Sequence, residues 1–249
     1  MYFNLLAGFT CTLALSACGG ATIQQFVPTY ANQAFSGAGV QLNHATGAAP
    51  AESSVSVFFD ASGNPFVTVN GIALSLAAQG GGLYTTSGGQ YVMGVGNVVG
   101  GNVITPDADY YVIQNRLTAQ TDSVYVDGLK TPAAAIAGLP AATYSGGTQF
   151  ATSGFNWSTG TIDLAINFGT GDVTGTLNGF NTAPTATLTL VPTTLSGTKF
   201  DTPLTSSTVN LSSGHINGAL YGPVAETVAG TLQVSTQSTH AIGLFGANR

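Results

Sequence analysis

The sequence predicts an all-β protein, with a β-rich N-terminal domain followed by an antiparallel eight-stranded β-barrel. Three observations support this fold class. Only 6% of the 249 residues are charged, so the charged residues that favour helices are nearly absent. The 34 glycines are spread through the chain without a three-residue period, which favours tight turns and bulges. Short apolar runs bounded by Gly, Asn, Asp or Pro recur from residue 53 onwards, and such runs are typical of strands.

The charge and cysteine content exclude several classes of function. Four Lys and Arg residues stand against ten Asp and Glu, which is too few cations to neutralise a nucleic-acid backbone or to form a polybasic membrane patch. The only cysteines are Cys11 and Cys18. The body of the chain therefore has no disulfide, no cysteine-ligated metal and no catalytic cysteine. No histidines have the spacing of a metal-binding motif.

The N-terminus has the features of a bacterial lipoprotein signal. An apolar run over residues 5–15 is too short to span a bilayer permanently and fits the core of a signal peptide. It leads into the sequence LSACGG at residues 15–20, which resembles a lipobox. We therefore predict a signal peptide over residues 1–17, lipidation of Cys18 with palmitate, and a lipidated tether over residues 18–30.

One feature departs from such a signal, because the first four residues carry no Lys or Arg and the usual positive region is missing. The alternative interpretation is an ordinary secretory signal with an incidental cysteine. If Cys18 carries several acyl chains, the anchoring is stable, since a single chain alone binds a membrane only reversibly.

Residues 31–130 are predicted to form the N-terminal β-rich domain, without a convincing helix. The runs at residues 53–60 and 66–74 flank a stretch of Asp, Gly, Asn and Pro, and this pattern predicts a hairpin. Further strands are predicted at residues 83–86, 90–93, 110–113 and 123–126.

Candidate ligand-binding residues lie beside the glycine-rich loops of this domain. Tyr84, Tyr91 and Met93 would form a binding surface there, because loops and aromatic side chains often carry recognition. Alternatively, the tyrosines pack between strands with their hydroxyls at the rim. His44 joins the same candidate set.

Haem is a possible ligand, although no resident cofactor or metal is predicted. Imidazole, thioether and phenolate groups all serve as haem ligands. The candidates are Met93, the tyrosines and the three histidines of the chain, which are His44, His215 and His240.

An alanine-rich linker is predicted at residues 131–142, with room for one helical turn, and a barrel at residues 143–249. Residues 161–168 alternate cleanly, with Ile162, Leu164 and Ile166 on one face. After an opening strand near Tyr144, the remaining barrel strands are predicted at residues 173–177, 185–191, 196–200, 209–211, 216–221, 228–234 and 241–245. A barrel of about eight strands can be filled by its own side chains.

Three stretches resemble the C-terminal barrel of the transferrin-binding protein B-like surface lipoproteins. They are residues 131–146, residues 166–177, and residues 218–231 together with 245–249. The resemblance implies a handle-like domain before the barrel and a place on the bacterial outer membrane, often at the cell surface. It also implies binding of a host iron carrier, haem or another host molecule, export by a surface-lipoprotein translocon, and no catalysis.

The leading hypothesis is thus a non-catalytic, outer-membrane-anchored lipoprotein that binds an extracellular ligand. The alternative is an integral eight-stranded outer-membrane β-barrel, which the low charge and the positive mean hydropathy of +0.30 favour. The lipobox and the lack of aromatic girdles argue against it. Catalysis is not predicted. A hydrolytic set could be imagined from His215, Asp201, Ser206 and Ser213, but the chain has no Gly-x-Ser-x-Gly elbow and such residues are common in any chain.

Overall fold

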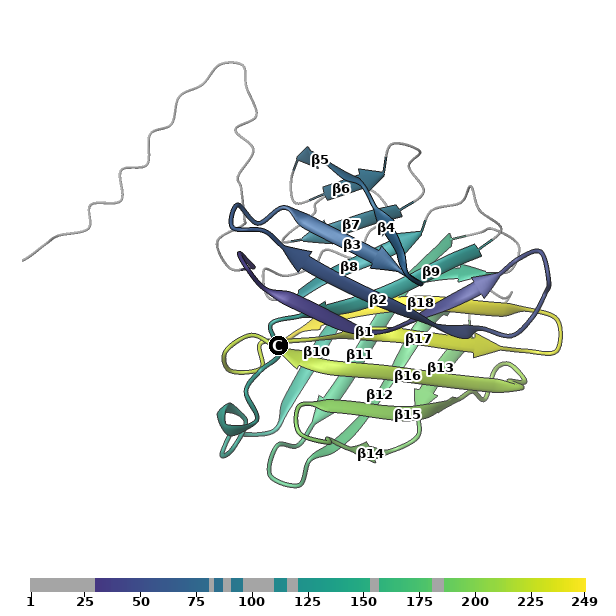
Figure 1. The fold of residues 1–249 in the computed structure, drawn as a ribbon. Helices are drawn as coiled ribbons and strands as arrows, with labels where there is room; N and C mark the ends of the chain where they lie inside the picture. The colour runs from purple at the N-terminus through teal and green to yellow at the C-terminus, as the bar shows by residue number, and fades with distance from the viewer. Residues whose placement is uncertain are drawn as a thin grey trace, which may run out of the picture.

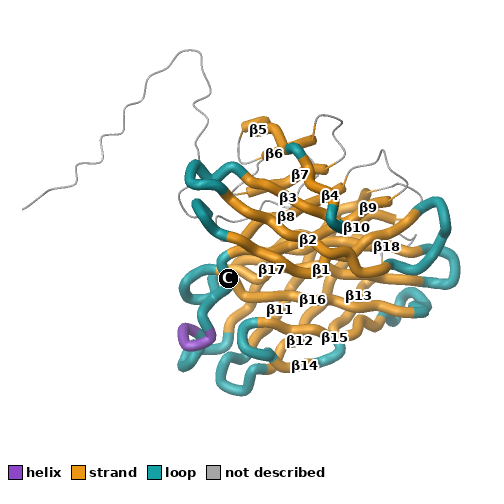
Figure 2. Tube along the Cα trace, viewed as in Figure 1, coloured by secondary structure: helices purple, strands orange, loops and turns teal. Residues whose placement is uncertain are grey.

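The computed structural model describes residues 30–80, 83–86, 91–95, 110–115, 121–152, 157–180 and 186–249. Within these ranges the chain forms two antiparallel sheets that pack together (Figure 1). Figure 2 shows that strands dominate the described residues and that a short helix lies in the connection between the sheets. No helix in the described part of the chain is long and apolar enough to cross a membrane.

The first sheet, called the N-terminal sheet here, has nine strands in the order β4-β3-β2-β1-β9-β8-β7-β6-β5. Its strands are β1 (Ala34–Asn43), β2 (Ala51–Phe59), β3 (Pro65–Val69), β4 (Ile72–Leu74), β5 (Leu76–Gly80), β6 (Leu83–Thr86), β7 (Tyr91–Val95), β8 (Tyr110–Asn115) and β9 (Thr121–Gly128). Alternation along β2 and β3 sends Val55, Val57 and Val67 into a shared core, because successive side chains point to opposite faces.

The second sheet closes into a barrel of eight strands, because its first strand in sheet order, β11, also pairs with β12. Its strands are β10 (Ala142–Thr152), β11 (Trp157–Ile166), β12 (Asp172–Phe180), β13 (Ala186–Leu190), β15 (Lys199–Thr205), β16 (Ser213–Tyr221), β17 (Thr227–Ser235) and β18 (His240–Asn248), with the short β14 (Thr193–Thr194) beside β12. The predicted fold class is confirmed.

The barrel interior is filled by apolar side chains. Ile162, Leu164 and Ile166 are buried there, and Phe150 lies 5.9 Å from Phe180 between ring centroids. Tyr144 donates its hydroxyl to the carbonyl oxygen of Ala225 at 2.7 Å, and its burial raises the pKa of the phenol to about 12. The inward-facing residues of a small barrel thus form a packed core.

The observed strands differ from the predicted ones in three respects. Residues 209–211 form no strand. The barrel therefore has eight strands, whereas nine segments were predicted for it. The run predicted at residues 66–74 is two strands, because Asn70 and Gly71 both take positive φ values (49° and 79°) and turn the chain back. The ten-residue strand β1 and the short β5 were not predicted.

The N-terminal sheet rests against the outer face of the barrel, where β1 and β9 cover β17 and β18. Leu42 and Val124 pack there with Ala229, Ile242 and Leu244. Strand β18 is therefore buried on both faces along almost its whole length.

The connection between the sheets is also attached to the barrel. Lys130 pairs with Tyr221 in an isolated bridge, and Thr131 donates its hydroxyl to the carbonyl oxygen of Gly222 at 2.7 Å. A single turn of 3-10 helix, η1 (Ala133–Ala135), follows. The predicted domain boundaries stay a prediction.

Candidate functional site: a cavity between the two sheets

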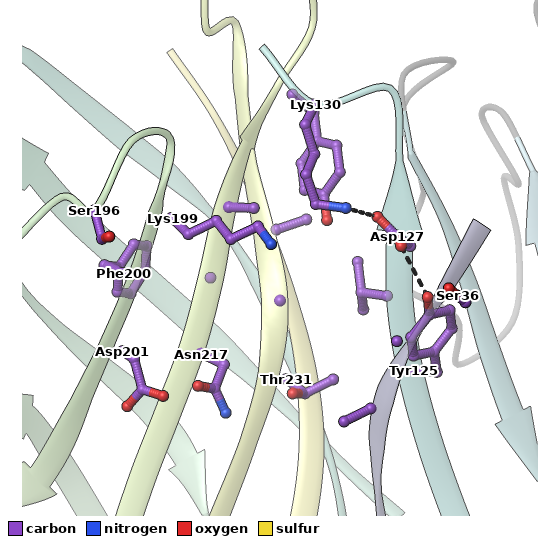
Figure 3. A pocket seen from close by; sticks show the side chains of 18 of the residues that line it. Ser36, Tyr125, Asp127, Lys130, Ser196, Lys199, Phe200, Asp201, Asn217 and Thr231 are labelled. Atoms are coloured by element: carbon purple, nitrogen blue, oxygen red, sulfur yellow. Dashed lines mark hydrogen bonds and ion pairs between the residues drawn. The ribbon is translucent and has the colours of Figure 1, made fainter. Parts of the chain in front are cut away.

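A cavity of about 370 Å³ lies where the N-terminal sheet meets the outer face of the barrel (Figure 3). Strands β1 and β9 form one wall, and β15, β16 and β17 form the other. Its volume is near the small end of the roughly 300–1,000 Å³ range of small-molecule sites. Strand alternation aims every second side chain of the barrel wall into this space.

The barrel wall presents two rows of side chains that cross three strands. In the first row Lys199, Ala219 and Ala229 are neighbours in the ladder, and in the second row Asp201, Asn217 and Thr231 are neighbours. Residues directly opposite in an antiparallel ladder share a face. The two alanines are small and nearly or fully buried, at 6% and 0% exposed, and they lie beside a row of hydrogen-bonding groups.

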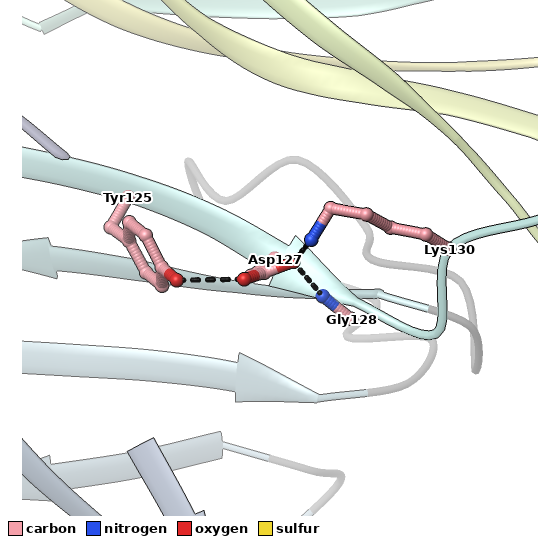
Figure 4. A network of polar contacts seen from close by, with 4 residues as sticks. All are labelled: Tyr125, Asp127, Gly128 and Lys130. Carbon is pink, nitrogen blue, oxygen red and sulfur yellow. Dashed lines mark hydrogen bonds and ion pairs between the residues drawn. The ribbon is translucent and has the colours of Figure 1, made fainter. Parts of the chain in front are cut away.

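The opposite wall holds a fixed polar network (Figure 4). Tyr125 donates its hydroxyl to Asp127 at 2.8 Å, and the backbone N–H of Gly128 donates to the same carboxylate at 2.9 Å. The ammonium group of Lys130 also donates to Asp127 and lies 6.0 Å from the ring centroid of Tyr221. Because Asp127 is only 6% exposed, these partners offset the cost of burying its charge.

Lys199 approaches the cavity from the barrel side. Its side chain reaches from β15 across the wall towards β16 and β17 (Figure 3). Among the residues that the structure describes, its ammonium group makes no hydrogen bond or ion pair, whereas Asp201 is paired with His215 at 2.7 Å.

Two of the predicted ligand-binding residues have buried side chains. The His44 side chain is 1% exposed, and its Nε2 lies 2.8 Å from Oδ2 of Asp122, whose side chain is fully buried. Tyr84 packs in the core of the N-terminal sheet, and its burial raises the pKa of the phenol. A ligand would reach either side chain only after a local rearrangement.

Tyr91 and Met93 lie on β7, but their side chains are outside the described part of the structure, as is Cys18. The remaining haem candidates are not brought together: His240 accepts or donates a hydrogen bond with Ser235, and His215 pairs with Asp201. In the described ranges, no group of three His, Cys, Asp or Glu residues gathers to hold a metal ion.

The sequence reasoning missed an aromatic pair on the exposed face of the N-terminal sheet. Phe58 and Phe66 are opposite each other on β2 and β3, with ring centroids 6.2 Å apart. They are 46% and 57% exposed, respectively. The alternation of the two strands was the signal that could have found them, since it places Val57 and Val67 on the buried face and these rings on the other.

Comparison with known proteins points to one family. The family model described as the C-lobe and N-lobe beta barrels of Tf-binding protein B matches residues 132–249. A Trp-to-Ala variant of transferrin-binding protein B from Haemophilus parasuis superposes with a TM-score of 0.56 at 17% identity, covering 86% of this chain and 44% of that chain. The isotype 1 protein from serogroup B Neisseria meningitidis gives a TM-score of 0.54 at 14% identity, with 87% and 43% covered.

This chain thus spans less than half the length of those two structures. No curated protein matches it significantly in sequence.

Proposed function

Because the C-terminal half of this chain belongs to the transferrin-binding protein B-like family, we propose that the protein is a lipid-anchored outer-membrane lipoprotein at the cell surface that binds an extracellular ligand without catalysis. The ligand is a host protein, with a host iron carrier as the first candidate and haem as a narrower alternative. The match of residues 132–249 to the barrel family carries this proposal.

The exposed aromatic pair Phe58 and Phe66 is our candidate for the contact surface. Exposed aromatic rings that lie side by side are unusual on a soluble surface and are enriched at protein interfaces. Exposed ionic groups are scarce in this chain, so apolar contact and hydrogen bonding supply most of the affinity. Tyr91 and Met93 remain candidates for the same recognition role.

Replacing both rings, Phe58→Ser with Phe66→Ser, is expected to weaken ligand binding at least tenfold, because each buried aromatic anchor contributes roughly 1–3 kcal/mol at an interface. The purified protein is tested by biolayer interferometry against immobilised transferrin and a panel of serum proteins, and by absorbance with haem. Val224→Ser is the control, since Val224 is also 46% exposed but lies in a barrel turn. A wild-type protein that binds none of these probes, or a double variant that binds as well as the wild type, contradicts the proposal.

The alternative, an integral outer-membrane barrel, requires an apolar exterior where lipid touches the strands. Here the apolar residues fill the interior, and the exposed positions of β11 carry Thr161 and Asp163. This arrangement supports anchoring by a lipid rather than by the strands.

Substituting Cys18→Ala is expected to abolish incorporation of labelled palmitate and to move the protein from the membrane fraction to the soluble fraction, because the acyl chains are the proposed anchor. The experiment uses the full chain expressed in a Gram-negative host. Cys11→Ala is the matched control and is expected to keep the label. A Cys18→Ala variant that stays in the membrane after carbonate washing supports the integral barrel instead.

A further inference from the structure

The cavity between the sheets contains both lysines of a chain that has only four Lys and Arg residues. A chance distribution would rarely gather half of so few cations at one small site. One of the two, Lys130, is held by Asp127. The other, Lys199, makes no ionic contact within the described ranges and extends into the cavity (Figure 3).

The cavity walls carry two lysines and two aspartates, and within the described ranges Lys199 is the one of these four without an ionic or hydrogen-bonding partner. Asp127 is balanced by Lys130, and Asp201 lies beside His215. Lys199 is therefore the group to which an incoming anion would be attracted. Because two carboxylates lie in the same walls, a singly charged carboxylate fits better than a doubly charged phosphate, which they would repel.

The rest of the lining selects for hydroxyl groups. Asn217 both donates and accepts hydrogen bonds, Thr231 does the same through its hydroxyl, and Asp201 accepts. Ala219, which is 6% exposed, adds a small apolar contact for the C–H face of a sugar ring, whereas Ala229 is fully buried. The volume of about 370 Å³ accommodates one such ring with bound water.

We propose that this cavity is a binding site for a small hydroxylated carboxylate, such as a single sugar-acid ring, whose carboxylate pairs with Lys199 and whose hydroxyls bond to Asn217 and Thr231. The Tyr125–Asp127–Lys130 network forms the preorganised opposite wall, so little ordering is needed on binding. The proposal is independent of macromolecular binding at Phe58 and Phe66, which lie on the exposed face of β2 and β3.

The test is a calorimetric titration of the purified protein with glucuronate and with glucose, which differ in the carboxylate but share the ring. Glucuronate is expected to bind with a Kd of about 1 mM or below, and glucose at least about tenfold more weakly, because a charge-assisted hydrogen bond is lost. Lys199→Gln is expected to reduce glucuronate affinity to the level of glucose. Its fold is checked by circular dichroism, and the exposed position of Lys199 predicts no loss of stability.

Thr189→Glu is the matched control, because it makes the same change in net charge on β13, outside the cavity lining. It is expected to bind glucuronate as the wild type does. Three results overturn the proposal: no saturable binding of glucuronate up to about 10 mM, equal binding of glucose, or unchanged binding by Lys199→Gln. Binding that falls equally in Thr189→Glu also overturns it, since the effect would then come from net charge.

Discussion

Replacing Gly146 with alanine is expected to destabilise the protein by about 3 kcal/mol or to prevent the barrel from closing. Strands β10 and β18 approach so closely at this point that an added Cβ would meet the carbonyl oxygen of Gly246 and lie 2.6 Å from the Cα of Ala247. Both obstacles are backbone atoms, which cannot move aside as a flexible side chain does. The free energy of unfolding of the variant is measured by urea denaturation.

The adjacent residue provides the control. A Cβ at Gly147 would meet only the carbonyl oxygen of Gly160, at 3.9 Å, which is an ordinary contact. Gly147→Ala is therefore expected to be neutral or slightly stabilising, because alanine loses less backbone entropy than glycine on folding. Equal effects of the two substitutions would show that the close approach of β10 and β18 does not limit the barrel.

Removing the carboxylate of Asp122 is expected to cost about 1–3 kcal/mol, since it removes a buried hydrogen bond to His44. Asp122 lies opposite Leu42 in the β1–β9 ladder, and Leu42 packs in the cluster shared with the barrel. Asp122→Ala should therefore loosen the packing of the N-terminal sheet on the barrel. Urea denaturation gives the loss of stability, and limited proteolysis shows which part opens first.

Asp163→Ala is the matched control for this pair. Asp163 also accepts a side-chain hydrogen bond, from Ser145 at 2.6 Å, but it is exposed on β11. Exposed contacts of this kind contribute about 0–1 kcal/mol. If the two alanine variants lose similar stability, the burial of the His44–Asp122 pair is not what makes it important.

The barrel was largely predictable because strands such as β11 and β15 alternate between buried and exposed residues with a period of two. Ile162, Leu164 and Ile166 point inwards as the alternation requires. The family resemblance rests on three stretches, among them residues 166–177 and the closing strands. The segment at residues 209–211 has similar apolar residues, yet it runs outside the sheet. Leu211 packs against the core from a loop, and composition alone cannot distinguish this from a short strand.

The sites were much less predictable, because they depend on contacts between residues far apart in the chain. His44 and Asp122 are separated by 78 positions, and nothing near either residue indicates the partner. The cavity likewise joins Tyr125 and Asp127 to Lys199, which lies on another sheet. The sequence showed only that lysine is scarce. This scarcity indicates a binding site only when the structure shows that both lysines line the same cavity.

The pairing of β10 with β18 also constrains the order of folding. Ser145 pairs with Asn248 in the β10–β18 ladder. The barrel therefore stays open until nearly the whole second half of the chain is available to fold. Contacts so distant in sequence form slowly, because a long loop must close before they contribute any stability. Until then β10 and β17 have unpaired edges, which are prone to aggregate. A chain that emerges from its N-terminus therefore cannot close its barrel until β18 has emerged.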